Sequence, residues 1–426
     1  MSIESLYALF RQYPSVQTDT RQLKPGDLFF ALKGENFNGN QFARQALEAG
    51  AVAAIIDEPA FAIEGKTILV PDVLKALQEL AGRHRDSFSV PFIAITGSNG
   101  KTTTKELLHA VLSSHFRTYT TEGNLNNHIG IPLTLLKVKP DAEMAVIEMG
   151  ANHQREIAGY CTYAKPDYGI ITNCGKAHLE GFGGVEGVRK GKGELYDYLR
   201  ANNGTAFIMQ DYDYLREMSR GISKIIRYGT READLEGNMV KSEPFLEVEI
   251  TKGAATGNIH TQLVGDYNLP NVLLAVCAGK CFGVPDKKIK TAIENYTPSN
   301  SRSQLLTLGN NQIILDAYNA NPSSMKLAIE NFARLQANEK ILMLGAMAEL
   351  GAESLQEHQA LIELIGQYQW KAVVLVGGDF LKTPHPFISC GDAAEARDWF
   401  RSQSFTGAHI LVKGSRSMKM EKVLEP

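Results

Sequence analysis

A run of glycine, lysine and threonine residues at 97–104 has the composition of a loop that binds phosphate. It reads Gly-Ser-Asn-Gly-Lys-Thr-Thr-Thr and follows the apolar run Phe-Ile-Ala-Ile, which is typical of a buried strand. Glycines let the backbone approach a phosphate closely, and the N–H groups at the start of the following helix bind anions. Lys101 can then reach the β and γ phosphates, and the Thr102 hydroxyl can bind Mg²⁺.

The spacing of this loop differs from the common form, in which four residues separate the two glycines. Here two residues separate Gly97 from Gly100, and counting back five positions from Gly100 reaches Ile95 inside the apolar run. A glycine-rich turn with a chance Lys-Thr pair is the alternative, but the strand before it and the helix after it favour a nucleotide site. The residues expected to contact the nucleotide are Gly97, Ser98, Asn99, Gly100, Lys101, Thr102 and Thr103.

Two further candidate metal ligands follow predicted strands. Glu148 ends the apolar run 145–148, and His178 comes shortly after the run 168–172. Ligands of an open parallel sheet bind at the carboxyl ends of its strands, so we expect both side chains near the phosphate loop. A hard cation needs carboxylates beside the phosphates. The alternatives are a solvated carboxylate at a strand end and a histidine with a structural role.

Two polar clusters carry a weaker signal. Residues 121–132 are dense in amides and glycines, which predicts either a plain polar loop or a set of hydrogen-bonding groups beside the nucleotide; its candidates are Asn124, Asn126 and Asn127. Arg189, Lys190 and Lys192 put three positive charges in four positions at the start of a predicted helix. Such a cluster usually forms a solvated face, so the pattern alone does not favour a function for Lys192.

Apolar runs that alternate with helical patterns predict an α/β protein of three domains, placed at 1–87, 88–297 and 298–426. Continuous apolar runs predict parallel sheets covered on both faces, and alternation at 245–250 predicts antiparallel edge strands in the middle domain. The third domain is Rossmann-like but lacks GxGxxG, so no dinucleotide cofactor is expected. Strands are predicted at 27–32, 51–56, 92–96, 145–148, 168–172, 312–316, 340–344, 372–376 and 409–412, and helices at 40–50 and 101–114.

Composition limits the classes of protein to consider. The chain has 426 residues, of which 44% are hydrophobic and 21% charged, as in ordinary globular proteins of more than one domain. A net charge of −3 gives no reason to expect nucleic acid or an anionic membrane as partner. No signal peptide is recognisable, and no apolar run reaches the ~18 residues of a membrane helix. Five cysteines without a CxxC pair suggest reduced thiols in a cytoplasm.

Four motifs in fixed order make the chain resemble the Mur ligases. They are TGSNGKTTT, GNLNNHIGIP, EMGANHQREI and TNCGKAHLEGFG, at 96–104, 123–132, 148–157 and 172–183. These enzymes use ATP to form amide bonds in bacterial cell-wall precursors, and the shortened phosphate loop is theirs. DAYNANPSSM, LVKGSRSMKME and the opening TDTR extend the resemblance over nearly the whole chain.

The resemblance implies a function for each domain and a set of substrates. The first domain would bind a UDP-N-acetylmuramoyl-tripeptide, the second ATP, and the third D-alanyl-D-alanine. The tripeptide carboxylate would attack the γ-phosphate of ATP, and the dipeptide amine would then displace phosphate from the acyl phosphate. The protein would be a cytoplasmic monomer whose domains move about linkers near 88 and 298. The resemblance does not decide whether the third residue of the tripeptide is diaminopimelate or lysine.

The resemblance also implies roles for individual residues. Lys101, His178 and Lys192 would be catalytic, with Lys192 N-carbamylated and its amine kept neutral by burial and by a nearby cation such as Lys190. Thr102, Glu148, His178 and Lys192 would bind a pair of Mg²⁺ ions. Asn271, Arg302 and Asp316 would contact ATP. The residues that would contact the other substrates are Thr18, Asp19, Thr20, Arg21, Asn124, Asn126, Asn127, Lys413 and Ser415.

One departure and three alternatives remain. The family segment usually reads LGDMxELG, but this chain has Ala346 in place of the aspartate. Any role of that position is therefore in doubt. The glutamate of the segment, Glu349, is present. A sister ligase that adds a single amino acid is the nearest alternative. A nucleotide-dependent switch or transport ATPase would leave the first domain unexplained. A binding module without catalysis is disfavoured because Lys101 and the candidate metal ligands are intact.

Overall fold

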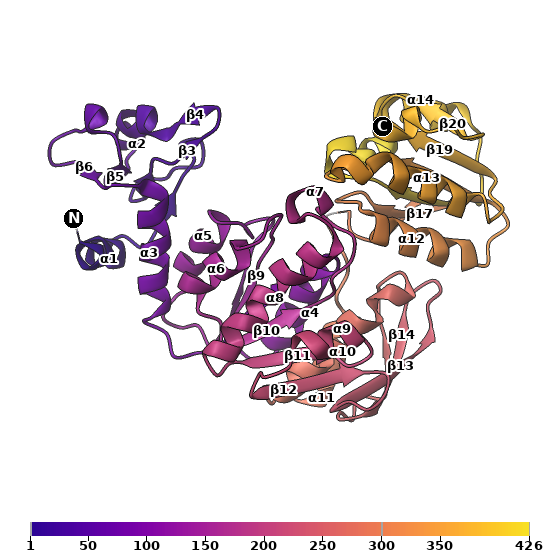
Figure 1. The fold of residues 1–426 in the computed structure, drawn as a ribbon, viewed down its shortest axis with the longest axis horizontal. Helices are drawn as coiled ribbons and strands as arrows, with labels where there is room; N and C mark the ends of the chain where they lie inside the picture. Colours follow the sequence, from indigo (N-terminus) through magenta and orange to yellow (C-terminus); the bar gives the residue numbers. More distant parts are fainter. Residues whose placement is uncertain (1, 300, 426) are drawn as a thin grey trace.

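Three α/β units follow one another along the chain (Figure 1). The structure is a computed structural model that describes residues 2–299 and 301–425. Each unit has its own largely parallel sheet, which confirms the predicted α/β class. We call them the N-terminal, middle and C-terminal units. Within the described residues, every helix falls short of the length and hydrophobicity that a membrane span requires.

The N-terminal unit has a small parallel sheet in the order β1-β2-β5-β6. Its strands are β1 (Val16–Gln17), β2 (Leu28–Phe30), β5 (Ala53–Ile56) and β6 (Thr67–Leu69), with a hairpin of β3 (Lys33–Gly34) and β4 (Phe37–Asn38). Its helices are α1 (Ile3–Gln12), α2 (Ala43–Glu48) and α3 (Val73–Arg85). The predicted helix at 40–50 starts as a 3₁₀ turn over Gly39–Phe42 before α2, and both predicted strands are shorter than expected.

The middle unit has the largest sheet, in the order β15-β14-β13-β12-β11-β10-β7-β9-β8. Its strands are β7 (Phe92–Thr96), β8 (Thr118–Thr120), β9 (Met144–Glu148), β10 (Tyr168–Ile171), β11 (Thr205–Met209), β12 (Lys224–Gly229), β13 (Leu235–Lys241), β14 (Glu247–Lys252) and β15 (Asn258–His260). β14 runs antiparallel to both of its neighbours, β13 and β15, as predicted for this edge. Its helices are α4 (Lys101–Ser113), α5 (Gly130–Leu136), α6 (Glu156–Ala164), α7 (Leu179–Phe182), α8 (Val185–Ala201), α9 (Asp213–Met218), α10 (Leu269–Cys281) and α11 (Asp286–Glu294).

The C-terminal unit has a sheet in the order β16-β17-β21-β18-β19-β20, parallel except for β16. Its strands are β16 (Gln304–Leu308), β17 (Asn311–Asp316), β18 (Lys340–Gly345), β19 (Ala372–Val376), β20 (Ile388–Cys390) and β21 (His409–Lys413). Its helices are α12 (Pro322–Arg334), α13 (Ser354–Ile365) and α14 (Ala393–Ser402). The four strands predicted here are present within one residue of their expected ends.

The register of the middle sheet places the candidate residues together. Ile95 of β7 lies opposite Ile170 of β10 on one side and Glu148 of β9 on the other. Three parallel strands therefore end at the same edge, and the loops that follow them meet there. This is the arrangement that the sequence predicted for the phosphate loop, Glu148 and the segment before His178.

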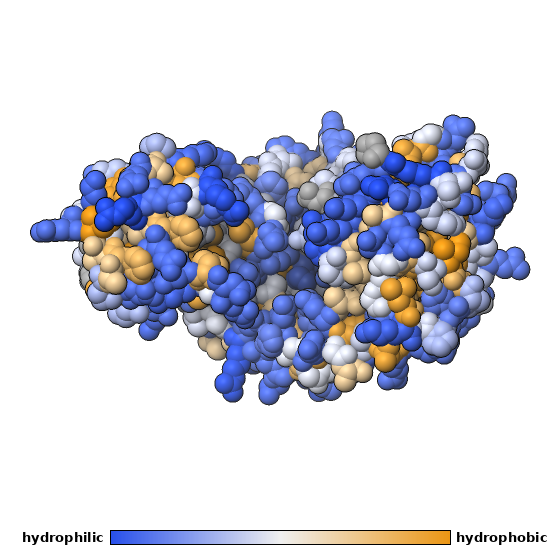
Figure 2. All heavy atoms as spheres, turned by 90° about the horizontal axis from the view of Figure 1, so that it is seen from above, coloured by the Kyte–Doolittle hydropathy of each residue, from blue (hydrophilic) through white to orange (hydrophobic). Residues whose placement is uncertain are grey.

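Helix α3 joins the N-terminal unit to the middle unit. It packs on α1 of its own unit and, more extensively, on α5 and α6 of the next (Figure 1). Its side chains Leu77 and Leu80 are fully buried and belong to a hydrophobic core that continues into the middle unit. Seen from above, the molecule has a deep crevice near the centre of this face, bordered largely by hydrophilic residues (Figure 2).

Candidate active site

A cavity of about 970 Å³ lies between the middle and C-terminal units. The middle unit contributes the phosphate loop, the loops after β8, β9 and β10, and the start of α10. The C-terminal unit contributes the segments before β16 and after β17, and the end of β21. The predicted residues that line it are Ser98, Asn99, Gly100, Lys101, Thr102, Thr103, Asn124, Asn126, Asn127, Glu148, His178, Asn271, Arg302, Asp316 and Lys413.

The phosphate loop needs both of its glycines. Gly97 and Gly100 have φ angles of +143° and +79°, which favour glycine. A Cβ atom on Gly97 would lie 2.0 Å from the Thr172 hydroxyl oxygen, and one on Gly100 would lie 3.1 Å from the Asn271 amide oxygen. Substitution would therefore displace the loop. Lys101 begins α4 directly after it, so the helix N-terminus faces the cavity.

The loop after β10 holds the phosphate loop, a role that the motif alone did not reveal. The Thr172 hydroxyl donates to the carbonyl of Asn99 at 2.6 Å, and the Asn99 N–H donates to the Asn173 side chain at 3.0 Å. The Ser98 hydroxyl donates to the carbonyl of Gly175 at 3.0 Å. The loop is thus preorganised by the neighbouring strand end, before any phosphate binds.

Lys101 is folded back onto its own loop. Its Nζ atom donates to the carbonyls of Gly97 and Ser98, at 2.7 and 3.3 Å. Burial lowers the pKa of this lysine, as does nearby Arg302, whereas Glu148 acts in the opposite direction. A phosphate in the cavity would compete with the two carbonyls for this cation, because charged acceptors form stronger hydrogen bonds than carbonyls do.

Glu148 is buried, with 2% of its surface exposed. Its Oε1 atom accepts hydrogen bonds from the Asn126 amide at 2.7 Å and the Thr102 hydroxyl at 3.3 Å. Its Oε2 atom is buried without a hydrogen-bond partner among the described residues. Leaving a buried carboxylate oxygen unpaired is costly, and oxygen ligands are what Mg²⁺ prefers. Thr102 and Glu148 therefore have the right chemistry for Mg²⁺.

The described residues contain no cluster of three or more His, Cys, Asp or Glu side chains that could hold a metal. Thr102 and Glu148 touch each other, and His178 lies in the wall of the same cavity. Lys192 is outside the cavity lining. Protein sites for Mg²⁺ commonly use one or two carboxylates together with substrate phosphates and water. The small number of protein ligands here therefore fits Mg²⁺.

Lys192 is buried, with 1% of its surface exposed, so the solvated-face alternative does not apply to it. Its Nζ atom donates to the carbonyl of Ala151 at 2.9 Å and lies 4.8 Å from the centre of the Phe182 ring. Burial lowers the pKa of this lysine to about 7, and the positive charge of Lys101 contributes. Lys190 was the cation expected to do this, but it is exposed and Lys101 takes its place.

Lys105 is a second buried lysine, which sequence reasoning missed. Its Nζ atom donates to the carbonyl of Thr121 at 2.6 Å and pairs with Glu106 at 2.8 Å. The Thr121 hydroxyl in turn accepts from the N–H of Glu148 at 2.9 Å. Lys105 therefore fixes the strand end that carries the Glu148 carboxylate. Its spacing from Leu108 and Leu112 places it on the buried face of α4, and this periodicity could have revealed it.

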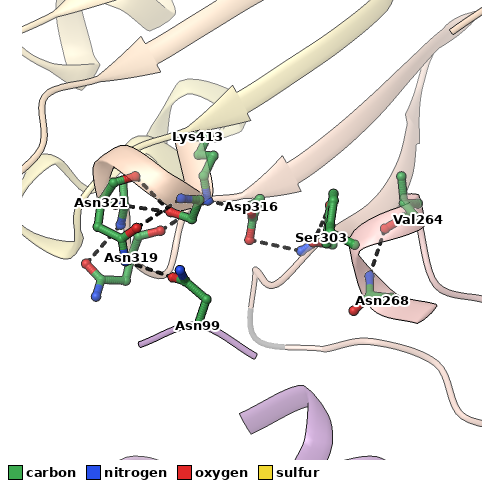
Figure 3. Close-up of polar contacts among 11 residues, drawn as sticks. Asn99, Val264, Asn268, Ser303, Asp316, Asn319, Asn321 and Lys413 are labelled. Atoms are coloured by element: carbon green, nitrogen blue, oxygen red, sulfur yellow. Dashed lines mark hydrogen bonds and ion pairs between the residues drawn. The ribbon is translucent and has the colours of Figure 1, made fainter. Parts of the chain in front are cut away.

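The far wall of the cavity is an ion pair in the C-terminal unit (Figure 3). Nζ of Lys413, at the end of β21, lies 2.5 Å from Oδ2 of Asp316, at the end of β17. The other Asp316 oxygen accepts from the N–H of Ser303 at 3.2 Å. The Arg302 guanidinium stacks 3.7 Å from the centre of the Tyr318 ring. Asp316 and Lys413, predicted for different substrates, thus form one ion pair, in which Lys413 is buried and Asp316 is partly exposed.

Asparagines connect the nucleotide loop to its surroundings. The Asn271 side chain accepts from the Thr104 hydroxyl at 3.0 Å and donates to Asn268 at 2.9 Å. The Asn321 amide, from the C-terminal unit, donates to the Asn99 side chain at 2.7 Å (Figure 3). Asn321 also caps α12, so this helix start and the phosphate loop are linked across the cavity.

Five predicted substrate residues lie outside the cavity lining. The backbone N–H groups of Thr18 and Asp19 donate to the Gln17 side chain. Arg21 pairs with Asp19 at 2.7 Å and lowers the pKa of that carboxyl to about 2, while Thr20 lies between them. The predicted residue that is buried elsewhere is Ser415, whose hydroxyl donates to the carbonyl of Ala346 at 2.7 Å.

Ala346, the departure from the family pattern, is buried at the end of β18. Its methyl group faces Gly378, where an added Cβ atom would lie 2.5 Å away from it. The structure gives no role to a carboxylate at this position.

Models of the Mur ligase family match the chain in three segments. The family's catalytic domain matches residues 12–85, its middle domain 95–279 and its glutamate ligase domain 301–416. UDP-N-acetylmuramoyl-tripeptide–D-alanyl-D-alanine ligase of Escherichia coli is 36% identical over 96% of this chain and 92% of that protein. The enzyme of the same name from Bacillus subtilis is 34% identical, with the same coverage.

Two crystal structures have the same fold over nearly the whole chain. MurF from Acinetobacter baumannii has a TM-score of 0.86 and 30% identity, and the match covers 96% of this chain and 92% of that one. MurF ligase from Thermotoga maritima, in complex with ADP, has a TM-score of 0.86 and 27% identity, and covers 96% of both chains.

Proposed function

Because the chain belongs to the Mur ligase family, we propose that it joins D-alanyl-D-alanine to a UDP-N-acetylmuramoyl-tripeptide. It is an ATP-dependent peptide ligase that forms ADP. The product is the UDP-muramoyl-pentapeptide of peptidoglycan synthesis. The observation that carries the proposal is the position of the cavity, because one wall holds the phosphate loop and the other holds the Asp316–Lys413 pair of a different unit.

The chemistry requires like charges to approach. The tripeptide carboxylate attacks the γ-phosphorus of ATP, and ADP leaves; the dipeptide amine then attacks the acyl carbon, and phosphate leaves. Lys101 would leave its loop carbonyls and neutralise charge on the transferring phosphoryl group. Thr102, Glu148 and His178 would hold Mg²⁺, which supplies further charge neutralisation when bound. The acyl phosphate is sensitive to water, so docking of the C-terminal unit would protect it.

We propose that the remaining residues divide the substrates as follows. Asn271, Arg302 and Asp316 would contact ATP, while Asn124, Asn126 and Asn127 would contact the tripeptide end beside Glu148. Thr18 to Arg21 would contact the uridine nucleotide in the N-terminal unit. Lys413 and Ser415 would serve the dipeptide side, Lys413 directly from the cavity wall and Ser415 through the backbone of Ala346.

Lys192 would carry a carbamate formed from CO₂ with release of a proton. This reaction needs a neutral amine, and a buried lysine whose pKa is about 7 supplies one near neutral pH. The carbamate would turn a cation into an anion with oxygen ligands for Mg²⁺. Lys192→Ala should be nearly inactive, and acetate or formate should restore part of the activity. Full activity without added anion would return Lys192 to a structural role.

We propose that the reaction takes place in the cytoplasm and that the enzyme is a monomer. All five cysteines are free thiols, as expected where disulfides are reduced. The net charge of −3 and the absence of any spanning helix among the described residues give no reason to expect nucleic acid or membrane insertion. Chromatography with light-scattering detection would test the monomer.

One assay tests the activity. The purified protein is incubated with ATP, Mg²⁺ and each UDP-muramoyl peptide, with and without D-alanyl-D-alanine, and phosphate release and product mass are measured. We expect phosphate release only with a UDP-muramoyl tripeptide and the dipeptide together. Release with a single amino acid in place of the dipeptide would favour a sister ligase. Rapid hydrolysis of ATP alone would favour a switch or transport ATPase.

A further inference from the structure

His178, in the wall of the cavity, contacts Glu349 of the C-terminal unit. Nδ1 of His178 is buried and lies against Oε2 of Glu349, without the alignment of a linear hydrogen bond. It has no other polar partner among the described residues. Both residues have left-handed backbones, with φ angles of +52° and +61°. Non-glycine residues in this conformation are uncommon and cluster at functional sites.

The loop that carries Glu349 is held in place from within the C-terminal unit. The N–H of Met347 donates to Nε2 of the fully buried His358 at 3.1 Å, and the other ring nitrogen of His358 lies 2.7 Å from the carbonyl of Ser354. Just beyond Glu349, Gly351 sits against Glu180, since a Cβ atom there would lie 3.1 Å from the Glu180 Cβ. The loop that holds the Glu349 carboxylate against His178 is therefore fixed at both of its ends.

We infer that Glu349 is a positioning residue for His178, and that it orients the imidazole with its Nε2 lone pair free to bind a metal ion. A carboxylate beside Nδ1 favours a proton on that nitrogen, which leaves Nε2 as the acceptor. The inference rests on the proposed function, because it takes His178 as the metal ligand that the proposal assigns. It adds that the ligand is correctly oriented only while the C-terminal unit is docked.

A second contact beside the first provides a matched control. Nζ of Lys176, two positions before His178, pairs with Glu357 of α13. This pair also joins the middle and C-terminal units by a glutamate, but it does not touch His178. Glu357→Gln therefore weakens the docking of the units in the way that Glu349→Gln does, while it leaves the imidazole partner in place.

The test measures metal binding rather than turnover. Mn²⁺ is titrated into full-length protein with AMP-PNP, and bound Mn²⁺ is followed by electron paramagnetic resonance. We expect Glu349→Gln to weaken Mn²⁺ binding by about 10- to 100-fold, the usual effect of losing a carboxylate behind a metal-bound histidine. Glu349→Asp should recover part of this loss. Glu357→Gln should change it by less than about 2-fold, because Glu357, whose side chain is only 10% exposed, does not touch the imidazole.

A second readout follows the ring itself. In protein with ¹⁵N-labelled histidine and no metal, the His178 signals should report a proton on Nδ1, and Glu349→Ala should shift the tautomer towards Nε2–H. The side chain of Glu349 is 53% exposed, so these variants should fold normally.

Two results would overturn the inference. One is unchanged Mn²⁺ affinity and an unchanged tautomer in Glu349→Gln and Glu349→Ala. The other is an equal loss of affinity in Glu357→Gln, which would mean that Glu349 acts only by docking the units. Failure of the proposed function looks different, because the wild-type protein itself would then bind no Mn²⁺ with AMP-PNP.

Discussion

The two interfaces between the units of this protein differ in chemistry. At the first, the α3 interface, helix α3 packs on α5 and α6 with Leu77 and Leu80 fully buried. Arg85 closes its end, stacking 3.9 Å from the centre of the Phe92 ring. The same guanidinium donates to the carbonyls of Ala164, Lys165 and Phe88 and to the carboxylate of Asp167.

The second, the cavity interface, is made largely of polar side-chain pairs around the site. These pairs are Asn99–Asn321, Lys176–Glu357, His178–Glu349 and Asp266–Arg334. The hydrophobic core does continue into the C-terminal unit. Among the described residues, however, no helix packs across this interface as extensively as α3 packs on α5 and α6.

The difference indicates which unit moves. Exposing buried leucines to water costs about 1.5–3 kcal/mol for each side chain. When a polar pair separates, water replaces each partner, so the net cost is about 1 kcal/mol or less. Motion about both linkers, near 88 and 298, was expected from the sequence. The packing favours motion about the linker near 298, with the N-terminal and middle units acting as one body.

The largest effect should come from Lys101, which serves catalysis and contributes little to either interface. Lys101→Ala should lower turnover by about two to three orders of magnitude, because a preorganised donor at the reacting centre contributes roughly 3–4 kcal/mol. Steady-state kinetics measures the loss, and circular dichroism should show unchanged folding. A variant with a third of normal turnover would contradict the assignment of the phosphate loop.

The next effect separates the α3 interface from the exposed face of the same helix. Arg85→Ala should lower the opening free energy of α3 and α6 by about 3 kcal/mol, because it leaves several backbone carbonyls without a charged donor. Native-state hydrogen exchange measures this locally. Lys75→Ala, which removes an exposed pair with Glu79, is the control and should change it by less than about 0.5 kcal/mol. Equal effects would mean that the interface is not held as described.

A pH effect tests the burial of Lys192. Its pKa is lowered to about 7 in the folded protein from 10.5, so between these values the unfolded chain holds a proton that the folded protein lacks. Stability should therefore rise with pH across this range, and the full cost of burying the charge is present below pH ~7.

The measurement compares wild type with Lys192→Met in CO₂-free buffer, by urea unfolding between pH 7 and 9. The stability difference should rise in favour of wild type by up to about 1.4 kcal/mol per pH unit. A difference that does not depend on pH would show that the amine is solvated.

The smallest effect concerns one polar pair of the cavity interface. Arg334→Ala removes the 2.5 Å contact with Asp266. The side chain of Arg334 is 60% exposed and that of Asp266 is 30% exposed. Because such pairs contribute about 0–1 kcal/mol, hydrogen exchange in α12 should change by no more than about 5-fold. A loss comparable to that of Arg85→Ala would remove the contrast between the two interfaces.

Much of the fold could be predicted because each buried strand is a local signal. The strands at 92–96 and 372–376 have the predicted ends, since continuous apolar runs mark strands that are covered on both faces. The helix predicted at 40–50 was only partly right, because Gly39–Phe42 forms a 3₁₀ turn whose start is capped by the Asn38 side chain. That cap depends on one side chain and not on periodicity.

The site was predictable as far as its residues follow strand ends in one sheet. Glu148 and the phosphate loop met as expected, because parallel strands end at the same edge. The partnership of His178 with Glu349 was not predicted, since spacing within a motif cannot show which segment of another unit packs against it.

Lys192 shows why a charge pattern can mislead. Gly187 and Gly191 lie on the same side of α8, where Cβ atoms would meet Phe182 at 1.9 and 2.4 Å. These glycines let α7 approach and cover the lysine, so the cluster of charges at 189–192 is solvated only in part. Two glycines four positions apart on one side of a helix leave room for a neighbouring segment to pack closely. That reading of Gly187 and Gly191 would have predicted the burial of Lys192.

Spin-label distances would test most directly which unit moves. Labels are placed on cysteines introduced in pairs at the exposed residues Glu64, Glu217 and Asp398, one for each unit, in protein with the exposed Cys281 replaced by serine. Distances are measured with and without Mg²⁺, AMP-PNP and the UDP-muramoyl tripeptide. The account predicts that the 64–217 distance stays narrow and constant, whereas the 217–398 distribution is broad without ligands and narrows when they bind. A 64–217 distance that changes with ligand while the 217–398 distance does not would contradict it.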